Sequence, residues 1–174
     1  GSAAEFKKWR AITSAITDAT STPILGGGLH EPLYGSNRDL ALSLAESSHY
    51  PLAQYSREAL PQVTQYLSID QSISTLRSDL NTQIRKKIQA RYGAELPEEL
   101  KAPNAPVLDL ISYGGKLMRQ SNPGEQHRVL AEQKLPIYIN TNYDNLMFDA
   151  LKEAGADPQI VICPWSDRFR AASI

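Results

Sequence analysis

Three short apolar segments, separated by stretches with helical patterns, constrain the fold of this chain more than any other feature. They lie at residues 22–25, 136–139 and 159–163, and the last two are rich in β-branched residues. Such runs are typical of buried parallel strands. Strands that alternate with helices pair in parallel, because each helix returns the chain to the same end of the sheet. The sequence therefore predicts an α/β fold, a Rossmann-like parallel sheet with flanking helices and a helical insertion.

The stretches between these segments carry apolar residues at three- and four-residue spacing, as amphipathic helices do. Ser36 or Asn37 is available to cap the second helix, and Gly93 and Gly155 are placed to end two others. We treat residues 1–174 as a single domain, with a Rossmann part at about 6–58 and 121–174 and an insertion at about 59–120. The expected helices are 6–19, one from residue 37, 60–69, 73–92, 107–119, a short one at 127–130, and 146–151.

The charge balance and the cysteine count exclude several classes of partner. The chain has 18 basic and 19 acidic residues, which indicates neither a nucleic-acid track nor a surface for anionic membranes. No apolar stretch approaches the roughly 20 residues that span a bilayer. With Cys163 as the only cysteine and three histidines, we expect no disulfide, no metal site and a cytoplasmic location. Cys163 lies on an apolar segment, so we expect it to be buried.

The first apolar segment ends at a glycine turn formed by Gly26, Gly27 and Gly28, ahead of a helical pattern. Glycines at this position let backbone N–H groups approach a phosphate closely, and a helix N-terminus adds favourable electrostatics. The run matches neither the spaced-glycine dinucleotide fingerprint nor the phosphate loop that ends in Gly-Lys-Ser/Thr. A tight turn that requires positive φ explains the run equally well.

A polar segment follows the second apolar one, and we call residues 140–144 the strand-end segment. Its sequence is NTNYD, at the edge where open α/β sheets place their ligands. Asn142 and Asp144 supply an amide and a carboxylate that can bond ribose hydroxyls or a carboxamide. The alternative is that Thr141 or Asn142 only caps the following helix.

Taken together, the glycine turn and the strand-end segment resemble two motifs of the bacterial sirtuin-like domains, which often occur in multidomain antiphage defence proteins. The matching residues are PILGGGL at 23–29 and YINTNYDNL at 138–146. Supporting blocks are EPL at 31–33, LPQVTQYL at 60–67 and HRVLA at 127–131, so the resemblance extends from about residue 22 to 165.

The resemblance implies that the chain binds NAD and that its parent protein cleaves the nicotinamide–ribose bond with water, giving nicotinamide and ADP-ribose. The glycine turn would lie near the phosphates, and Asn142 and Asp144 near ribose and nicotinamide. Asn142 would position the ribose or the attacking water. The implied cofactor-binding residues are Gly26, Gly27, Gly28, Leu29, Thr141, Asn142 and Asp144.

The chain departs from the family pattern at its histidines. His30 stands where the family has a small hydroxyl residue, and no histidine follows His127, although the family's catalytic histidine lies downstream of the strand-end segment. We expect a C-terminally truncated piece, a missing stretch or a degenerate domain. His30 is a candidate substitute base, because an imidazole with a pKa near about 6.5 suits proton transfer at neutral pH. The alternative for His30 is a hydrogen-bonded loop residue, and His49 and His127 are expected to be structural.

The leading hypothesis is therefore an NAD hydrolase domain, the effector of a larger bacterial protein whose other domains sense a trigger. A catalytically inactive nucleotide sensor or oligomerisation module, with NAD or ADP-ribose as its ligand and a homo-oligomer as its assembly, is the first alternative. A protein deacylase is the second. A dehydrogenase fits less well, because no acidic residue follows the glycine turn at the usual distance in a second strand.

Overall fold

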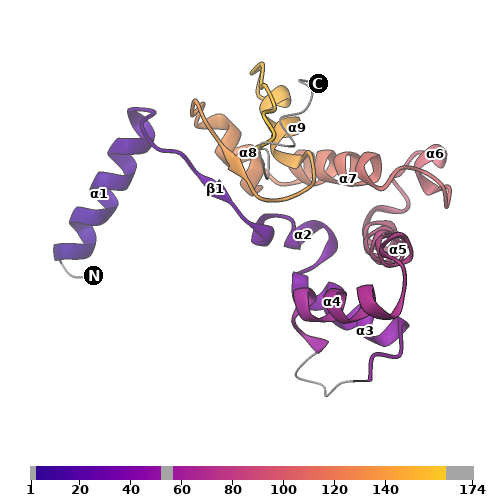
Figure 1. Cartoon of the computed structure of the whole chain (residues 1–174). Coiled ribbons are helices and arrows are strands. Elements are labelled where there is room, and N and C mark those ends of the chain that lie inside the picture. The colour runs from indigo at the N-terminus through magenta and orange to yellow at the C-terminus, as the bar shows by residue number, and fades with distance from the viewer. Residues whose placement is uncertain (1–2, 52–56, 164–174) are drawn as a thin grey trace.

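Helices dominate the computed structural model, which describes residues 3–51 and 57–163 (Figure 1). The strands are β1 (Ile24–Leu25) and β2 (Ile139–Asn140). The helices are η1 (Gly27–Leu29, a 3-10 turn), α1 (Ala3–Thr17), α2 (Glu31–Tyr34), α3 (Asn37–Ser47), α4 (Leu60–Asp70), α5 (Ile73–Tyr92), α6 (Glu98–Lys101), α7 (Val107–Ser121), α8 (Gln126–Glu132) and α9 (Leu146–Glu153).

The prediction of a Rossmann-like parallel sheet is wrong. The described residues form one sheet of two strands, in which β1 and β2 pair in parallel with Ile24 opposite Ile139. Residues 159–163, expected as a third strand, have no regular structure, and Val161 is 89% exposed. Cys163 is exposed as well, contrary to expectation. An apolar β-branched run becomes a strand only when another strand offers its backbone groups, and a sequence pattern does not reveal that partner.

The long helices lie close to their predicted positions because local signals fix their ends. Ser36 begins α3 with a capping box, since its side chain accepts the N–H of Asp39 while Asp39 accepts the N–H of Ser36. Ser72 caps α5 in a similar way by accepting the N–H of Thr75. Gly93 follows the last residue of α5, as predicted. These are contacts within one turn of helix, so the sequence contains all that they require.

The core consists mainly of helices packed on helices, which is why a small sheet suffices. Its largest cluster joins α2, α5, α7 and α9 through fully buried side chains, among them Ile88, Leu110 and Leu146. A second cluster joins α3 to α4 and includes Leu44 and Val63. The third cluster packs one face of the sheet against α8 and α9 and consists of Leu25, Ala131, Met147 and Ala150.

Candidate functional site

The two segments singled out in the sequence meet where β1 and β2 end. The backbone N–H of Thr141 donates to the carbonyl oxygen of Leu25 at 3.0 Å, and the Thr141 hydroxyl donates to the same oxygen at 2.8 Å. These bonds extend the parallel pairing by one residue beyond the strands. They place the glycine turn beside the strand-end segment. We call the place where these two segments meet the junction.

Asn142 forms the direct link across the junction. Its side-chain Nδ2 donates to the carbonyl oxygen of Gly26 at 3.2 Å, although the residues are 116 positions apart in the chain. Its backbone N–H donates to the side chain of Asn140 at 3.0 Å, which fixes the bend after β2. Asn142 is half-buried and does not cap α9, since Asn145 occupies that position. The expectation that Thr141 or Asn142 is only a helix cap is therefore wrong.

His30 lies at the inner side of the junction and is 5% exposed. Its ring stacks on that of Tyr34, with centroids 4.5 Å apart and planes inclined by 14°. Neither ring nitrogen has a hydrogen-bond partner among the described residues. Burial lowers the pKa of His30 below its usual value, against an opposing attraction from Asp144. The ring is thus neutral at pH 7. The Asn37 side chain approaches the ring and opposes the lowering of its pKa, but it does not meet the geometry of a hydrogen bond.

Asp144 also contacts Tyr34 and is 6% exposed. One carboxylate oxygen accepts the Tyr34 hydroxyl at 3.4 Å, and the other accepts the backbone N–H of Leu146 at 3.2 Å. Burial raises the pKa of Tyr34 above its usual range, so the phenol stays protonated and remains a donor. Asp144 therefore connects α2 to the first residue of α9.

The three glycines of the turn differ in their surroundings. A Cβ on Gly27 would lie 3.1 Å from Nδ2 of Asn37 and 3.2 Å from Cε1 of His30, whereas a Cβ on Gly26 or Gly28 would meet nothing within 4 Å. Positive φ occurs at other glycines and not at these, so the interpretation as a positive-φ turn is wrong. Open space beside two glycines is compatible with a ligand approaching the backbone.

The helix predicted from residue 37 is confirmed as α3, but it does not follow the glycine turn directly. The 3-10 turn η1 and the four-residue helix α2 come between the turn and α3. Glu31 begins α2 with a negative charge. A long helix N-terminus therefore does not face the glycine turn, and a phosphate there would be held by backbone N–H groups alone. Leu29, another expected cofactor-binding residue, packs against the third core cluster.

Two functional candidates were missed in the sequence. Tyr34 lies four residues after His30, the spacing at which helical side chains touch, and that signal was available. The second is a buried pair in which Nδ1 of His127 lies 2.6 Å from a carboxylate oxygen of Glu125. Burial acts to raise the pKa of Glu125, but hydrogen bonds from His127 and the Arg128 N–H outweigh it and lower that pKa. His127 thus has a buried carboxylate beside it.

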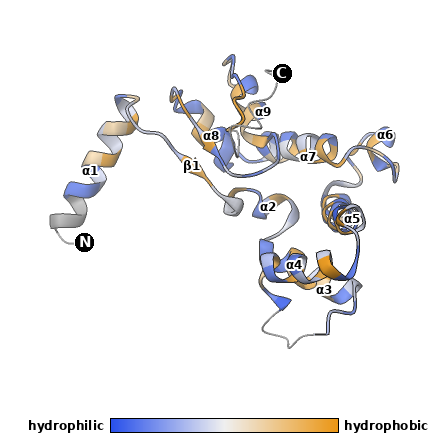
Figure 2. Cartoon of the chain, in the orientation of Figure 1, coloured by the Kyte–Doolittle hydropathy of each residue, from blue (hydrophilic) through white to orange (hydrophobic). Residues whose placement is uncertain are grey.

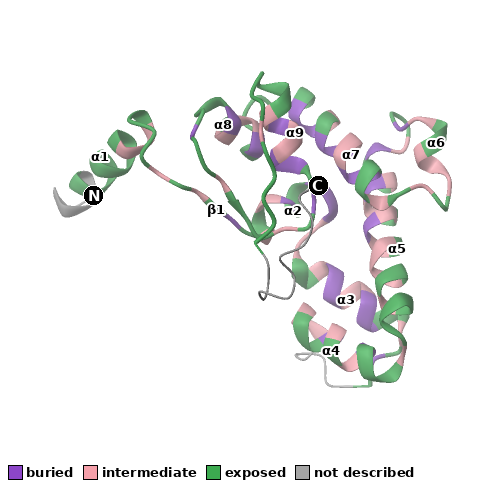
Figure 3. Cartoon of the chain, turned by 45° about the horizontal axis from the view of Figure 1, so that its top comes forward, coloured by how far each residue is buried: buried purple, intermediate pink, exposed green. Residues whose placement is uncertain are grey.

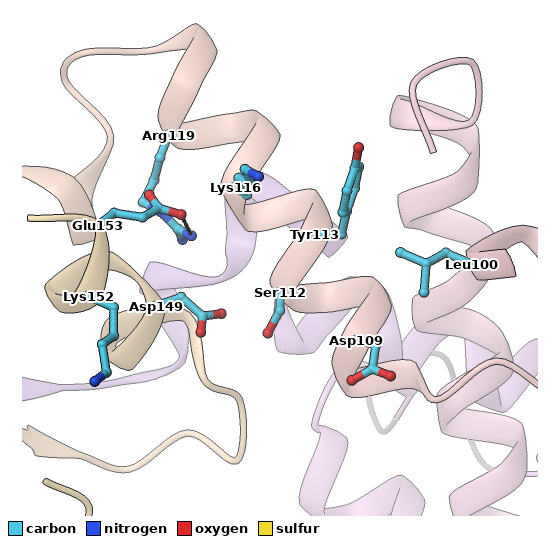
Figure 4. A pocket seen from close by; sticks show the side chains of 9 residues that line it. All are labelled: Leu100, Asp109, Ser112, Tyr113, Lys116, Arg119, Asp149, Lys152 and Glu153. Carbon is cyan, nitrogen blue, oxygen red and sulfur yellow. Dashed lines mark hydrogen bonds and ion pairs between the residues drawn. The ribbon is translucent and has the colours of Figure 1, made fainter. Parts of the chain in front are cut away.

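A cavity of about 460 Å³ lies elsewhere, over α7 and α9 (Figure 4). The buried guanidinium of Arg119 forms one wall and makes two bonds of 2.8 Å to Glu153. Asp149 points across the gap toward Ser112, and one oxygen of Asp149 is buried without a hydrogen-bond partner among the described residues. None of the lining residues belongs to the glycine turn or to the strand-end segment.

Within residues 3–51 and 57–163, no group of three or more histidine, cysteine, aspartate or glutamate side chains is arranged to hold a metal ion. The helices of this part of the chain are all too short or too polar to cross a membrane. Comparison of the chain with protein-family models, with curated proteins and with solved structures found no match.

Proposed function

We propose that the chain carries the NAD-binding part of an NAD hydrolase, with the junction as its site. The observation that supports this most is the hydrogen bond of 3.2 Å from Asn142 Nδ2 to the carbonyl oxygen of Gly26. It brings together the two motifs that resemble the sirtuin-like pattern, although most of the chain separates them. The proposal does not depend on a Rossmann-like sheet, which the described residues do not form.

In the proposed reaction, the bond between nicotinamide N1 and ribose C1′ breaks and its electron pair leaves with neutral nicotinamide. The oxygen of a water molecule bonds to C1′ and releases one proton, giving ADP-ribose. The bond breaks through an oxocarbenium-like centre, so the site must orient the ribose and the water. Asn142 is assigned to this positioning, because its amide oxygen is not used by the bond to Gly26.

His30 is assigned to accept the proton from the attacking water. Its ring is neutral at pH 7 because burial lowers the pKa, and both nitrogens lack partners among the described residues. Gly27 lies against this ring, and the neighbouring Gly26 contacts Asn142. The two assigned side chains are therefore linked through adjacent residues of one turn. A buried polar ring without partners is costly for folding, which favours a functional role for it.

A nucleotide-binding module without catalysis is the second candidate, and the contacts of the strand-end segment support it. The Thr141 hydroxyl donates a hydrogen bond to Leu25, and the side-chain N–H of Asn142 donates one to Gly26. Both carboxylate oxygens of Asp144 accept hydrogen bonds from within the protein. These hydrogen bonds hold the three side chains in place, so the side chains can stabilise the fold and contact a nucleotide without taking part in catalysis. For either candidate we propose a cytoplasmic location, to which the exposed free thiol of Cys163 is suited.

Titration calorimetry with NAD, combined with an assay of nicotinamide release, tests the proposal on this chain. Asn142→Ala is the test variant and Asn104→Ala the matched control, because Asn104 is exposed and distant in sequence from the junction. We expect NAD to bind to the control as to the parent chain and at least tenfold more weakly to Asn142→Ala. Binding with release supports the hydrolase, and binding without release supports the second candidate. A parent chain that binds no NAD contradicts both.

A further inference from the structure

The sheet has one apolar face that residues 3–51 and 57–163 leave uncovered. Ile24, Ile137 and Ile139 are 71%, 58% and 47% exposed. Ile24 is paired with Ile139, and Ile137 precedes Ile139 by two residues, so all three point to the same side. Leu25, on the opposite side, is buried against α8 and α9. A solvent-facing side of a sheet is normally polar, and three exposed isoleucines mark an interaction surface.

Helix α1 carries a second uncovered apolar face. Trp9 and Ile12 lie one turn apart on it and are 67% and 49% exposed. The helix lies apart from the other helices in both views, and its coloured part carries both apolar and exposed residues (Figures 2 and 3). An isolated helix of 15 residues is marginal in water and depends on packing of its apolar face. This face therefore needs a partner.

The end of α1 is fixed in a way that directs the helix away from its own sheet. The N–H of Thr20 donates to the carbonyl of Ala15 at 2.9 Å and that of Ala19 to Ile16 at 3.0 Å, with Ala19 at φ 53°. This is the Schellman arrangement that closes a helix. Residues 20–23 then continue into β1 without a turn (Figure 1). Folding α1 back over its own isoleucines would require residues 20–23 to bend away from this extended course.

We propose that α1 of one copy packs its Trp9–Ile12 face on the exposed isoleucines of a second copy, and that the exchange is reciprocal. Two unpartnered apolar faces of one chain are then covered by one symmetric contact. An aromatic side chain buries about 150–250 Å², so Trp9, at 67% exposed, retains roughly 100–170 Å² to bury. With the aliphatic residues of both contacts the total is on the order of 1,000 Å², the lower range of specific interfaces. The dimer is therefore weak and depends on concentration.

Sedimentation of the whole chain over a range of concentrations measures this equilibrium. Trp9→Gln on the helix and Ile24→Thr on the strand each remove one side of the contact, and Ile24→Thr keeps a β-branched residue. Ile69→Gln is the matched control, since Ile69 is 83% exposed but lies on α4. We expect both test variants to weaken the dimer at least tenfold and the control to leave it unchanged. A parent chain that remains monomeric at high concentration, or three variants with equal effects, overturns the proposal.

Disulfide trapping distinguishes exchange between copies from folding back within one copy. In a Cys163→Ser background, Ile12→Cys on α1 and Ile139→Cys on β2 are combined in one chain and oxidised. We expect a covalent dimer that is linked between copies and disappears when either cysteine is omitted. A disulfide within a single chain, or no disulfide at all in a folded protein, contradicts the exchange.

Discussion

Replacing His30 with phenylalanine tests whether the histidine is maintained at the cost of stability. Phenylalanine keeps an aromatic ring stacked on Tyr34, where the centroids are now 4.5 Å apart, and removes two nitrogens that lack partners among the described residues. An unpaired polar group in a protein interior costs about 1–3 kcal/mol. The larger ring, pressed against Gly27, reduces the gain. We therefore expect His30→Phe to be more stable by about 1–2 kcal/mol at pH 7.5.

The pH dependence of stability gives a second, independent measure of the same burial. Because burial lowers the folded-state pKa of His30, the unfolded chain binds more protons as the pH falls below about 6.5, and the native chain loses stability in that range. His30→Phe lacks this loss, so its advantage increases between pH 7.5 and 5.5. His49→Phe, at an exposed position, is the control.

Urea unfolding followed by circular dichroism at both pH values measures these differences. With a slope of about 1–3 kcal/mol per molar urea, the gain corresponds to a midpoint roughly 0.3–2 M higher. Nicotinamide release, if the parent chain shows it, should be lost in His30→Phe. A variant less stable than the parent at both pH values would refute the reasoning, because the imidazole would then have partners that stabilise it.

Two further pairs of substitutions test contacts at the glycine turn and at the cavity over α7 and α9. Gly27→Ala places a methyl group against His30 and should cost about 1–3 kcal/mol by overpacking, whereas Gly28→Ala meets nothing within 4 Å and should change the urea midpoint little. Glu153→Ala leaves the guanidinium of Arg119, whose side chain is 2% exposed, without its partner, and should cost about 2–3 kcal/mol. Arg119→Met leaves only the carboxylate of Glu153 unpaired, and because that side chain is 41% exposed the substitution should cost less stability in the same urea assay. A larger loss for Arg119→Met than for Glu153→Ala would contradict this account of the ion pair.

The helices could be predicted from the sequence, and the sheet could not, for a physical reason. A helix such as α3 closes its hydrogen bonds within one turn, so Ser36 and Asp39 are adjacent signals in the sequence. A strand needs acceptors and donors from a distant segment. The pairing of Ile24 with Ile139 depends on that distant contact. Residues 159–163 are also apolar and β-branched, but they pair with no strand among the described residues.

At the candidate site, too, some residues could be predicted from the sequence and others could not. The polar residues Asn142 and Asp144 were predicted from their position after an apolar segment, and they do lie where the two distant loops meet. The burial of His30 could not be predicted, because it follows from how α2 packs against α5 and α7. Tyr34 was missed although its spacing from His30 is a local signal, since an isolated four-residue helix carries no periodic pattern.

The contact between Tyr34 and Asp144 allows a final test of how firmly the junction is built. Their oxygens are 3.4 Å apart, longer than the roughly 2.5–3.0 Å of a strong O–H···O bond, so this bond stabilises weakly. Tyr34→Phe should therefore cost no more than about 0.5 kcal/mol. Asp144→Leu also removes the acceptor for the Leu146 N–H at the start of α9 and should cost about 1–3 kcal/mol.

A double-mutant cycle with Tyr34→Phe and Asp144→Asn, measured by urea unfolding, isolates the bond itself. We expect a coupling free energy of at most about 0.5 kcal/mol, because asparagine retains an acceptor for Leu146. Each oxygen of Asp144 accepts one hydrogen bond and keeps a second lone pair. Under the proposed NAD-binding function, Asp144→Asn should therefore lower NAD affinity more than it lowers stability. A coupling above about 1.5 kcal/mol would mean that Asp144 is fully committed to Tyr34, and its role in binding the nucleotide would then have to be abandoned.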